Sequence, residues 1–163
     1  MSSASSFYEL SSKNTDGVEI SMAKFTSRVC LVVNLNYTQL VELDRRYRDR
    51  GLQILLYPCN QFANQEPGTN DEILAFARSF GVTFPVMEKA DVNGSKTQPV
   101  FKYLKSKLRG TFTSTIKWNY TKFLIDRNGQ PYKRFGTFTP PIKLIDDILD
   151  LLDEEMRPTS ACD

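Results

Sequence analysis

Few residues in this sequence could perform redox or nucleophilic chemistry. It contains no histidine and three cysteines, Cys30, Cys59 and Cys162, and no Cys-x-x-Cys pair. The absence of histidine excludes Ser-His-Asp and Cys-His hydrolases and most zinc chemistry. An odd, small number of cysteines argues against a disulfide framework, so we expect reduced thiols.

The surroundings of these cysteines predict different reactivities. Cys30 lies inside the apolar run 29–33, where burial raises the pKa of a thiol and makes it inert. Cys59 follows the end of a predicted strand, and Cys162 lies in the tail, where we expect it to be exposed. Cys59 is therefore the thiol most in need of a structural test.

The bulk composition indicates one ordinary globular domain. The chain has 163 residues, of which 40% are hydrophobic and 25% charged. We expect a single domain over 1–163, with flexible tails at 1–6 and 157–163. A net charge of +2 does not indicate a nucleic-acid partner. The start of the chain lacks the basic and apolar regions of a secretory signal, so we expect a cytoplasmic protein.

The middle of the chain predicts a strand–helix–strand unit. The run 29–33 is β-branched and continuously apolar, which is typical of a strand buried on both faces of a parallel sheet. A helix should follow, with Asn36 as its N-cap and Gly51 after its end. A second buried strand is expected over 52–57, so the unit reads as a right-handed βαβ crossover.

The flanking segments complete the expected architecture. Strands are expected at 7–12, 18–21, 123–125 and 132–135, and helices at 69–80, 98–108 and from Pro140 onward. This pattern predicts an α/β, thioredoxin-like fold: a central mixed sheet flanked by helices, with an N-terminal β-hairpin. A fold of this kind does not by itself give a function.

Three stretches resemble the glutathione peroxidase family. The first is Pro-Cys-Asn-Gln-Phe at 58–62, which continues as Gln-Glu-Pro-Gly at 65–68. The second is Ile-Lys-Trp-Asn-Tyr-Thr-Lys-Phe-Leu at 116–124. The third is Asn-Tyr-Thr-Gln-Leu at 36–40. The resemblance extends from about residue 7 to about residue 152. Within the family the chain most resembles the monomeric phospholipid hydroperoxide glutathione peroxidases.

The resemblance implies a peroxide-reducing site. In the family a selenolate or thiolate attacks a peroxide oxygen beside a glutamine, a tryptophan and an asparagine, which correspond here to Gln65, Trp118 and Asn119. Their N–H donors would stabilise an anion at one point. The oxidised nucleophile would be reset by a thiol such as glutathione, with no bound cofactor or metal. Without the resemblance, Trp118 would be interpreted as a core residue and Asn119 as a turn residue.

One segment departs from the family pattern. The family carries its nucleophile between the buried strand and the following helix, but here Asn34 is joined to Asn36 through Leu35 alone. On the order of ten residues are missing, which leaves a connection at the short end of the usual 2–6 residues. Cys59 is a weak candidate for a substitute nucleophile. The position of the resolving cysteine in thioredoxin-dependent relatives is Arg78, so that mechanism is not supported.

Two hypotheses about function follow from this departure. The first is a glutathione peroxidase that reduces hydrogen peroxide and organic or lipid hydroperoxides in the oxidative stress response. Its nucleophile segment would have been lost as a false intron around a selenocysteine codon, in a splice form, or in a degenerate paralogue. The second is a catalytically silent thioredoxin-fold protein that binds a partner or lipid.

Charged residues allow two interpretations. A basic cluster could attract glutathione or give weak contact with an anionic membrane surface, or it could be a solvated face; its members are Lys102, Lys105, Lys107, Arg109, Lys117, Lys122, Lys133 and Arg134. The acidic residues of the last helix fit a solvated face better than a metal site. We expect a monomer.

Overall fold

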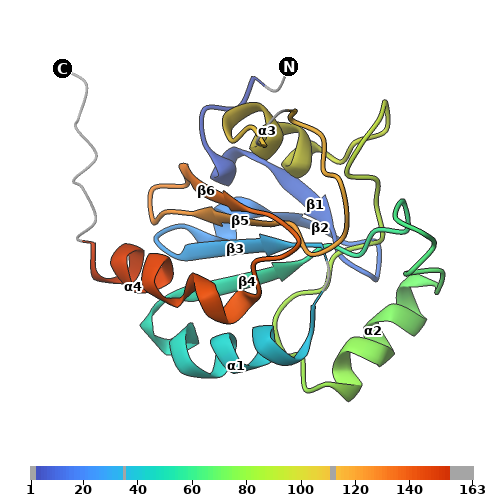
Figure 1. The fold of residues 1–163 in the computed structure, drawn as a ribbon, viewed down its shortest axis with the longest axis horizontal. Coiled ribbons are helices and arrows are strands. Elements are labelled where there is room, and N and C mark those ends of the chain that lie inside the picture. The colour runs from blue at the N-terminus through green and yellow to red at the C-terminus, as the bar shows by residue number, and fades with distance from the viewer. Residues whose placement is uncertain (1–2, 35, 111–112, 155–163) are drawn as a thin grey trace.

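A computed structural model describes residues 3–34, 36–110 and 113–154. Its centre is a mixed sheet in the order β4-β3-β5-β6 (Figure 1). The strands are β3 (Val29–Val33), β4 (Leu52–Leu56), β5 (Lys122–Ile125) and β6 (Pro131–Phe135). β3 runs parallel to β4 and antiparallel to β5, and β5 pairs antiparallel with β6. A separate hairpin joins β1 (Ser11–Lys13) to β2 (Glu19–Ser21), as predicted.

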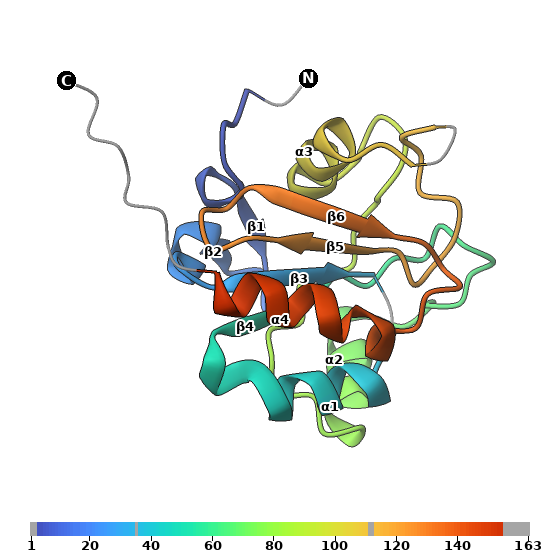
Figure 2. The ribbon, with the colours of Figure 1, turned by 60° about the vertical axis from the view of Figure 1, so that its left-hand side comes forward.

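Helices cover both faces of this sheet (Figure 2). They are α1 (Thr38–Tyr47), α2 (Asn70–Ser79), α3 (Pro99–Lys107) and α4 (Ile145–Asp153), with short 3₁₀ segments η1 (Phe7–Glu9), η2 (Met22–Phe25), η3 (Arg48–Arg50) and η4 (Pro141–Leu144). α1, α2 and α4 contribute to one hydrophobic core cluster, and α3 contributes with the N-terminal segments to the other. None of the helices in the described part of the chain is long and apolar enough to span a membrane.

The alternation of side chains along β3 divides these two cores. Val29, Leu31 and Val33 join the cluster on the α1 and α4 face. Cys30 and Val32 join the cluster beneath α3. Cys30 is fully buried, and this burial raises the pKa of its thiol to about 12. The predicted inertness of Cys30 therefore has a direct structural cause.

The first predicted strand was partly wrong. Residues 7–9 form η1, and the strand begins only at Ser11. The Ser6 hydroxyl accepts a hydrogen bond from the Tyr8 backbone N–H, and the Phe7 N–H donates to Gly129 O at 2.9 Å. These contacts turn the chain locally so that the Phe7 side chain is buried in the core.

The start of α1 also differs from the sequence prediction. Tyr37, not Asn36, occupies the N-cap position, and it makes no side-chain capping hydrogen bond. Asn36 instead has a φ of 146°, a region that non-glycine residues rarely adopt. α2, by contrast, has the predicted capping box between Thr69 and Glu72. α1 and α4 both begin without a side-chain cap, and in α1 the residue expected to be the cap has a positive φ.

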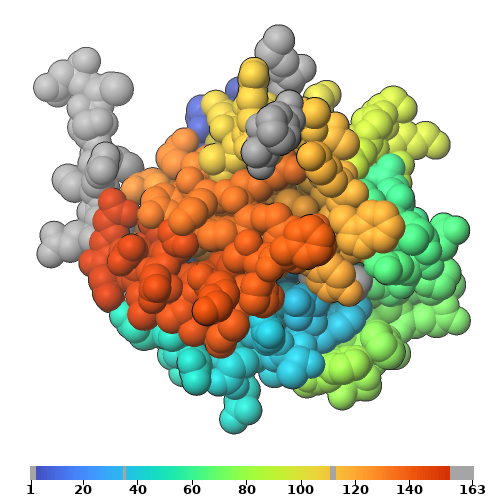
Figure 3. Space-filling model, viewed as in Figure 1, coloured from blue at the N-terminus to red at the C-terminus, as the bar shows by residue number. Residues whose placement is uncertain are grey.

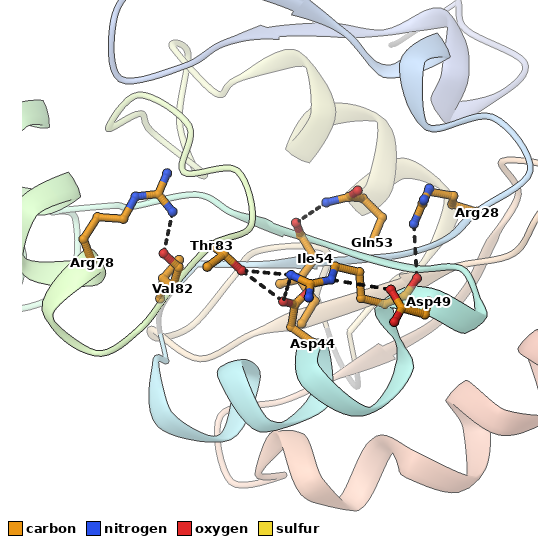
Figure 4. Close-up of polar contacts among 9 residues, drawn as sticks. Arg28, Asp44, Asp49, Gln53, Ile54, Arg78, Val82 and Thr83 are labelled. Atoms are coloured by element: carbon orange, nitrogen blue, oxygen red, sulfur yellow. Dashed lines mark hydrogen bonds and ion pairs between the residues drawn. The ribbon is translucent and has the colours of Figure 1, made fainter.

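A polar network joins α1 to the segment that follows α2 (Figure 4). The buried Asp44 carboxylate accepts from Thr83 Oγ1 at 3.3 Å and lies 3.4 Å from Arg48 Nη1. Burial raises the pKa of Asp44, and the Arg48 charge and the Thr83 hydrogen bond oppose this rise. Arg78 donates to Val82 O just beyond α2. These contacts join α1 to the segment that follows α2 and tie that segment to the end of α2.

Candidate active site

Three side-chain amides form a chain beyond the end of β3. Asn34 Nδ2 donates to Asn119 Oδ1 at 3.2 Å, and Asn119 Nδ2 donates to Gln65 Oε1 at 2.9 Å. Asn34 and Asn119 are fully buried, whereas Gln65 is exposed. The structure thus brings two of the three predicted site residues into direct contact. It adds Asn34, to which the sequence analysis assigned no role in the site.

The direction of this amide chain determines which donors face solvent. Because Gln65 uses its oxygen to accept from Asn119, its amide nitrogen keeps two hydrogens for a ligand. At the buried end, Asn34 Oδ1 has no hydrogen-bond partner among the described residues. An unsatisfied buried acceptor costs about 1–3 kcal/mol. The amide chain is therefore hydrogen-bonded at its centre, at Asn119, and has an unpaired acceptor at its buried end, at Asn34.

Trp118 lies beside this chain rather than in the core. Its side chain is 41% exposed, and its ring centroid is 6.0 Å from that of Phe62 at an interplanar angle of 44°. Phe62 belongs to the loop that carries Gln65, so the Trp118 ring packs against that loop. This position leaves the indole near solvent, where its N–H can serve a ligand.

Asn93 connects the two loops that carry the site. Its side chain donates to Ile116 O at 2.7 Å and accepts from the Ile116 N–H at 3.0 Å. Gln61 Nε2 donates to Asn93 O at 3.0 Å, and Gln61 Oε1 accepts from the Asn93 N–H at 3.0 Å. Sequence reasoning missed Asn93 because it lies in none of the three stretches that resemble the family.

A second set of contacts joins the Gln65 loop to Tyr37 and Lys89. The buried Glu66 carboxylate accepts from the Tyr37 hydroxyl at 3.4 Å, and burial raises the pKa of Glu66. Lys89 Nζ donates to Gly68 O at 2.6 Å and lies 3.4 Å from Glu66 O. The loop therefore gains its shape from groups on α1 and on the segment after α2.

The Gln65 loop also contains two consecutive left-handed residues. Ala63 and Asn64 have φ values of 52° and 51°. Asparagine tolerates this conformation, but alanine loses roughly 1–2 kcal/mol relative to its right-handed conformation. This backbone explains why a glycine is the more favourable residue at position 63.

Cys59 does not reach this site. Its side chain is 1% exposed and belongs to the core cluster beneath α3. Its Sγ lies 3.6 Å from Gln61 Oε1, and burial raises the pKa of the thiol despite nearby backbone hydrogen bonds. Cys162 lies outside the described residues. Neither described thiol therefore has the exposure or the lowered pKa of a nucleophile.

A hollow of about 670 Å³ adjoins Trp118. Three of its lining residues are cationic, Arg109, Lys117 and Arg134, and Trp118 and Tyr120 supply aromatic surface. The lining residues at 109–110, 113–121 and 134–138 lie on the face seen in Figure 3. This composition suits an anionic ligand with an apolar part. The described residues contain no group of three or more potential metal-ligating side chains.

Only some members of the basic cluster predicted from sequence are exposed cations. Lys122 is fully buried in β5, and Lys105 on α3 uses its ammonium group internally, donating to Val92 O. Arg134 donates to Ser114 O at 3.0 Å. The sheet and its loops therefore use some of these cations as hydrogen-bond donors.

The profile of the family described as "Glutathione peroxidase" matches residues 7–105. The chain belongs to the glutathione peroxidase family. It is 43% identical over 160 residues to "Glutathione peroxidase" of Schistosoma mansoni, covering 92% of this chain and 95% of the relative. It is 44% identical over 156 residues to "Phospholipid hydroperoxide glutathione peroxidase" of Bos taurus, covering 89% of this chain and 79% of the relative.

One solved structure supports the same family, and a second, more distant one shares the fold. The crystal structure of T. cruzi GPX1 has a TM-score of 0.73 at 33% identity, covering 90% of this chain and 96% of that chain. A thiol:disulfide interchange protein of the thioredoxin family from Chlorobium tepidum TLS has a TM-score of 0.65 at 15% identity, covering 90% of this chain and 95% of that chain. The predicted thioredoxin-like fold is confirmed.

The alignments with these relatives are longer than the part of this chain that they cover. The S. mansoni alignment has 160 positions but takes in 92% of the 163 residues here, which is about 150. About ten aligned positions of that relative therefore have no counterpart in this chain. The bovine alignment, with 156 positions over 89% of this chain, leaves a gap of similar size.

Proposed function

We propose that this family member reduces hydrogen peroxide and organic or lipid hydroperoxides with glutathione or a related thiol, as part of the response to oxidative stress. The observation that carries the proposal is the Asn34–Asn119–Gln65 amide chain, which ends in exposed donors beside Trp118. Such donors stabilise negative charge that develops during peroxide cleavage.

The reaction that this site would support has two stages. A thiolate or selenolate attacks one peroxide oxygen, the O–O bond breaks, and the other oxygen leaves as an alkoxide or hydroxide that takes up a proton. Two thiols then reduce the resulting sulfenic or selenenic acid, releasing water and forming a disulfide. The Gln65 amide and the Trp118 indole would donate to the charged sulfur or selenium and to the leaving oxygen.

We further propose that the functional product carries its nucleophile in a segment of about ten residues between Asn34 and Asn36. The strained φ of Asn36, the uncapped start of α1 and the unpartnered Asn34 Oδ1 all lie at this connection. The gap of about ten positions in the alignments with relatives has the size expected for that segment. A false intron around a selenocysteine codon explains these features together.

The hollow beside Trp118 would serve the thiol substrate or an anionic surface. Arg109, Lys117 and Arg134 line it, and glutathione carries two carboxylates. The same cations would give weak attraction to an anionic membrane, worth about 1 kcal/mol for each cation near the surface. We propose a cytoplasmic monomer, which light scattering after gel filtration would test.

A catalytically silent binding protein is the second candidate for the chain as it stands. The observation that favours it is the burial of both described thiols, Cys30 and Cys59, whose pKa values are both raised by burial. A protein of this kind would keep the fold and the amide chain without turnover.

A peroxidase assay on three proteins distinguishes these candidates. The first is the chain itself, and the second is its Cys59→Ser variant. The third carries the strand–helix segment of the S. mansoni relative in place of the 34–36 connection, with cysteine as the nucleophile. We expect turnover of a lipid hydroperoxide with glutathione only in the third protein.

The matched control carries serine at the inserted nucleophile. Activity in the inserted protein that survives this change would contradict the proposed role of the segment. Activity of the original chain that Cys59→Ser abolishes would show instead that Cys59 is the nucleophile. Sequencing the full transcript tests the origin of the gap, because continuous codons from 34 to 36 would exclude the false intron.

A further inference from the structure

Lys122 is a buried lysine without an acidic partner. It lies in β5, where its backbone pairs with Val33 and Phe135, and it is 0% exposed. Lysine is almost never fully buried unless it is paired. In the described residues, however, its ammonium group forms no ion pair and donates only to the carbonyl oxygens of Gly136, at 3.1 Å, and Thr139. Hydrogen bonds reduce the cost of burying a polar group, so the two carbonyl contacts offset part of the desolvation of this ammonium group.

The segment that Lys122 holds touches the active site. Gly136 and Thr139 bracket a turn after β6, closed by a Thr139 N–H to Gly136 O hydrogen bond of 3.3 Å. Thr137 lies in this turn, and its hydroxyl donates to Asn119 O at 3.0 Å. A continuous set of hydrogen bonds therefore runs from Lys122 through the turn to Asn119.

Asn119 belongs to a turn that requires such support. Tyr120, the next residue, has a φ of 68°, which costs a non-glycine residue about 1–2 kcal/mol. Thr121 Oγ1 donates to Trp118 O at 3.3 Å, so a residue of the same turn fixes the Trp118 carbonyl. The next carbonyl, Asn119 O, accepts its hydrogen bond from Thr137, which lies in the turn after β6. A strained backbone persists only where its surroundings fix it.

We propose that Lys122 is a positioning residue for the active site: through the turn 136–139 and the Thr137 hydroxyl, it holds Asn119 where it can bond Gln65. The importance of this contact for catalysis rests on the proposed function, whereas the contact itself does not. The hydrogen bonds that it concerns exist in the chain as it stands and can be tested without turnover.

The test measures solvent exchange of the Asn119 side-chain amide by NMR. Thr137→Val removes the hydroxyl at nearly constant shape, while Thr137→Ser keeps it. Lys122→Met removes the ammonium group. Loss of one hydrogen bond of ordinary strength should speed Asn119 amide exchange about fivefold in the Val and Met variants. The Ser variant should exchange like the unmodified protein.

Two reference signals separate positioning from general stability. The backbone amides of Leu31 and Leu124 lie in the central strands and report global opening. Positioning predicts faster exchange at Asn119 with little change at these amides. The double variant Lys122→Met/Thr137→Val should show no larger effect than the greater single change, because both act through one set of contacts.

Three results would overturn the inference. One is equal exchange at Asn119 in the Val and Ser variants of Thr137. Another is a Lys122→Met effect that is as large at Leu31 and Leu124 as at Asn119. The third is full additivity in the double variant. If Lys122→Met does not fold, Lys122→Gln takes its place, because it is also uncharged but keeps a short donor in the strand. Because none of these readouts requires peroxide reduction, a failed peroxidase assay leaves them unaffected.

Discussion

Replacing the buried Lys122 with methionine should change how stability depends on pH. Burial lowers the pKa of Lys122 to about 8, against an ordinary value of 10.5. Between these values the unfolded chain binds a proton that the folded protein has released. Stability therefore rises with pH across this window, and the charged form is penalised below it. Lys122→Met removes this dependence.

The size of the effect follows from the difference in pKa. One pKa unit corresponds to about 1.4 kcal/mol, so the full difference amounts to roughly 3 kcal/mol. Most of it develops between pH 8 and 10. From pH 7 to pH 9.5, the free energy of unfolding of the unmodified protein should rise by about 2 kcal/mol relative to Lys122→Met.

Urea unfolding of both proteins at pH 7 and pH 9.5 measures this difference. Cys30 and the buried tyrosines also respond to alkaline pH, but they are present in both proteins and their contributions cancel in the difference. Lys143→Met, at an exposed lysine on η4, removes the same charge and should show no such change. A difference between the unmodified protein and Lys122→Met that stays within about 0.5 kcal/mol would refute the reasoning, because ΔΔG values of that size are ordinary for surface changes.

Three further predictions concern helix ends and thiols. Thr69→Ala should lower the free energy of unfolding by about 1 kcal/mol, because it removes the capping box of α2; urea unfolding measures this. Asn36→Gly should raise it by about 1 kcal/mol, because glycine tolerates a φ of 146°; the same titration tests it. In a Cys162→Ser variant, Cys30 and Cys59 should resist a thiol reagent in the folded protein and react fully in denaturant, since both are buried with raised pKa values.

Each of these predictions has a matched control. Thr38→Ala removes an exposed threonine from the first turn of α1, where no side-chain cap exists, and should change stability by only a few tenths of a kcal/mol. Asn128→Gly changes an asparagine that does not have a positive φ and should give no stabilisation. Equal losses at Thr69 and Thr38, stabilisation at both asparagines, or rapid labelling of the folded protein would contradict the respective predictions.

The local elements could be predicted because their causes lie within a few residues. The apolar run 29–33 required a buried strand, and Thr69 with Glu72 supplied the capping box that opens α2. The motifs that resemble the family named Gln65 and Asn119 as site residues, and the structure brings these two side chains into contact. Asn36 also has the residue type of an N-cap, but its φ of 146° is not the extended conformation that a cap adopts, and Tyr37 takes the position instead.

The sequence alone determined the family, the fold class and the burial of Cys30. Only the tertiary structure decided that Asn34, Gln65 and Asn119 form one amide chain, because residues so far apart meet only through strand register and loop shape. The same holds for Lys122, which the sequence grouped with surface cations. Its burial depends on β5 lying between β3 and β6 and on the turn 136–139 folding over it, and no pattern of neighbouring residues encodes that arrangement.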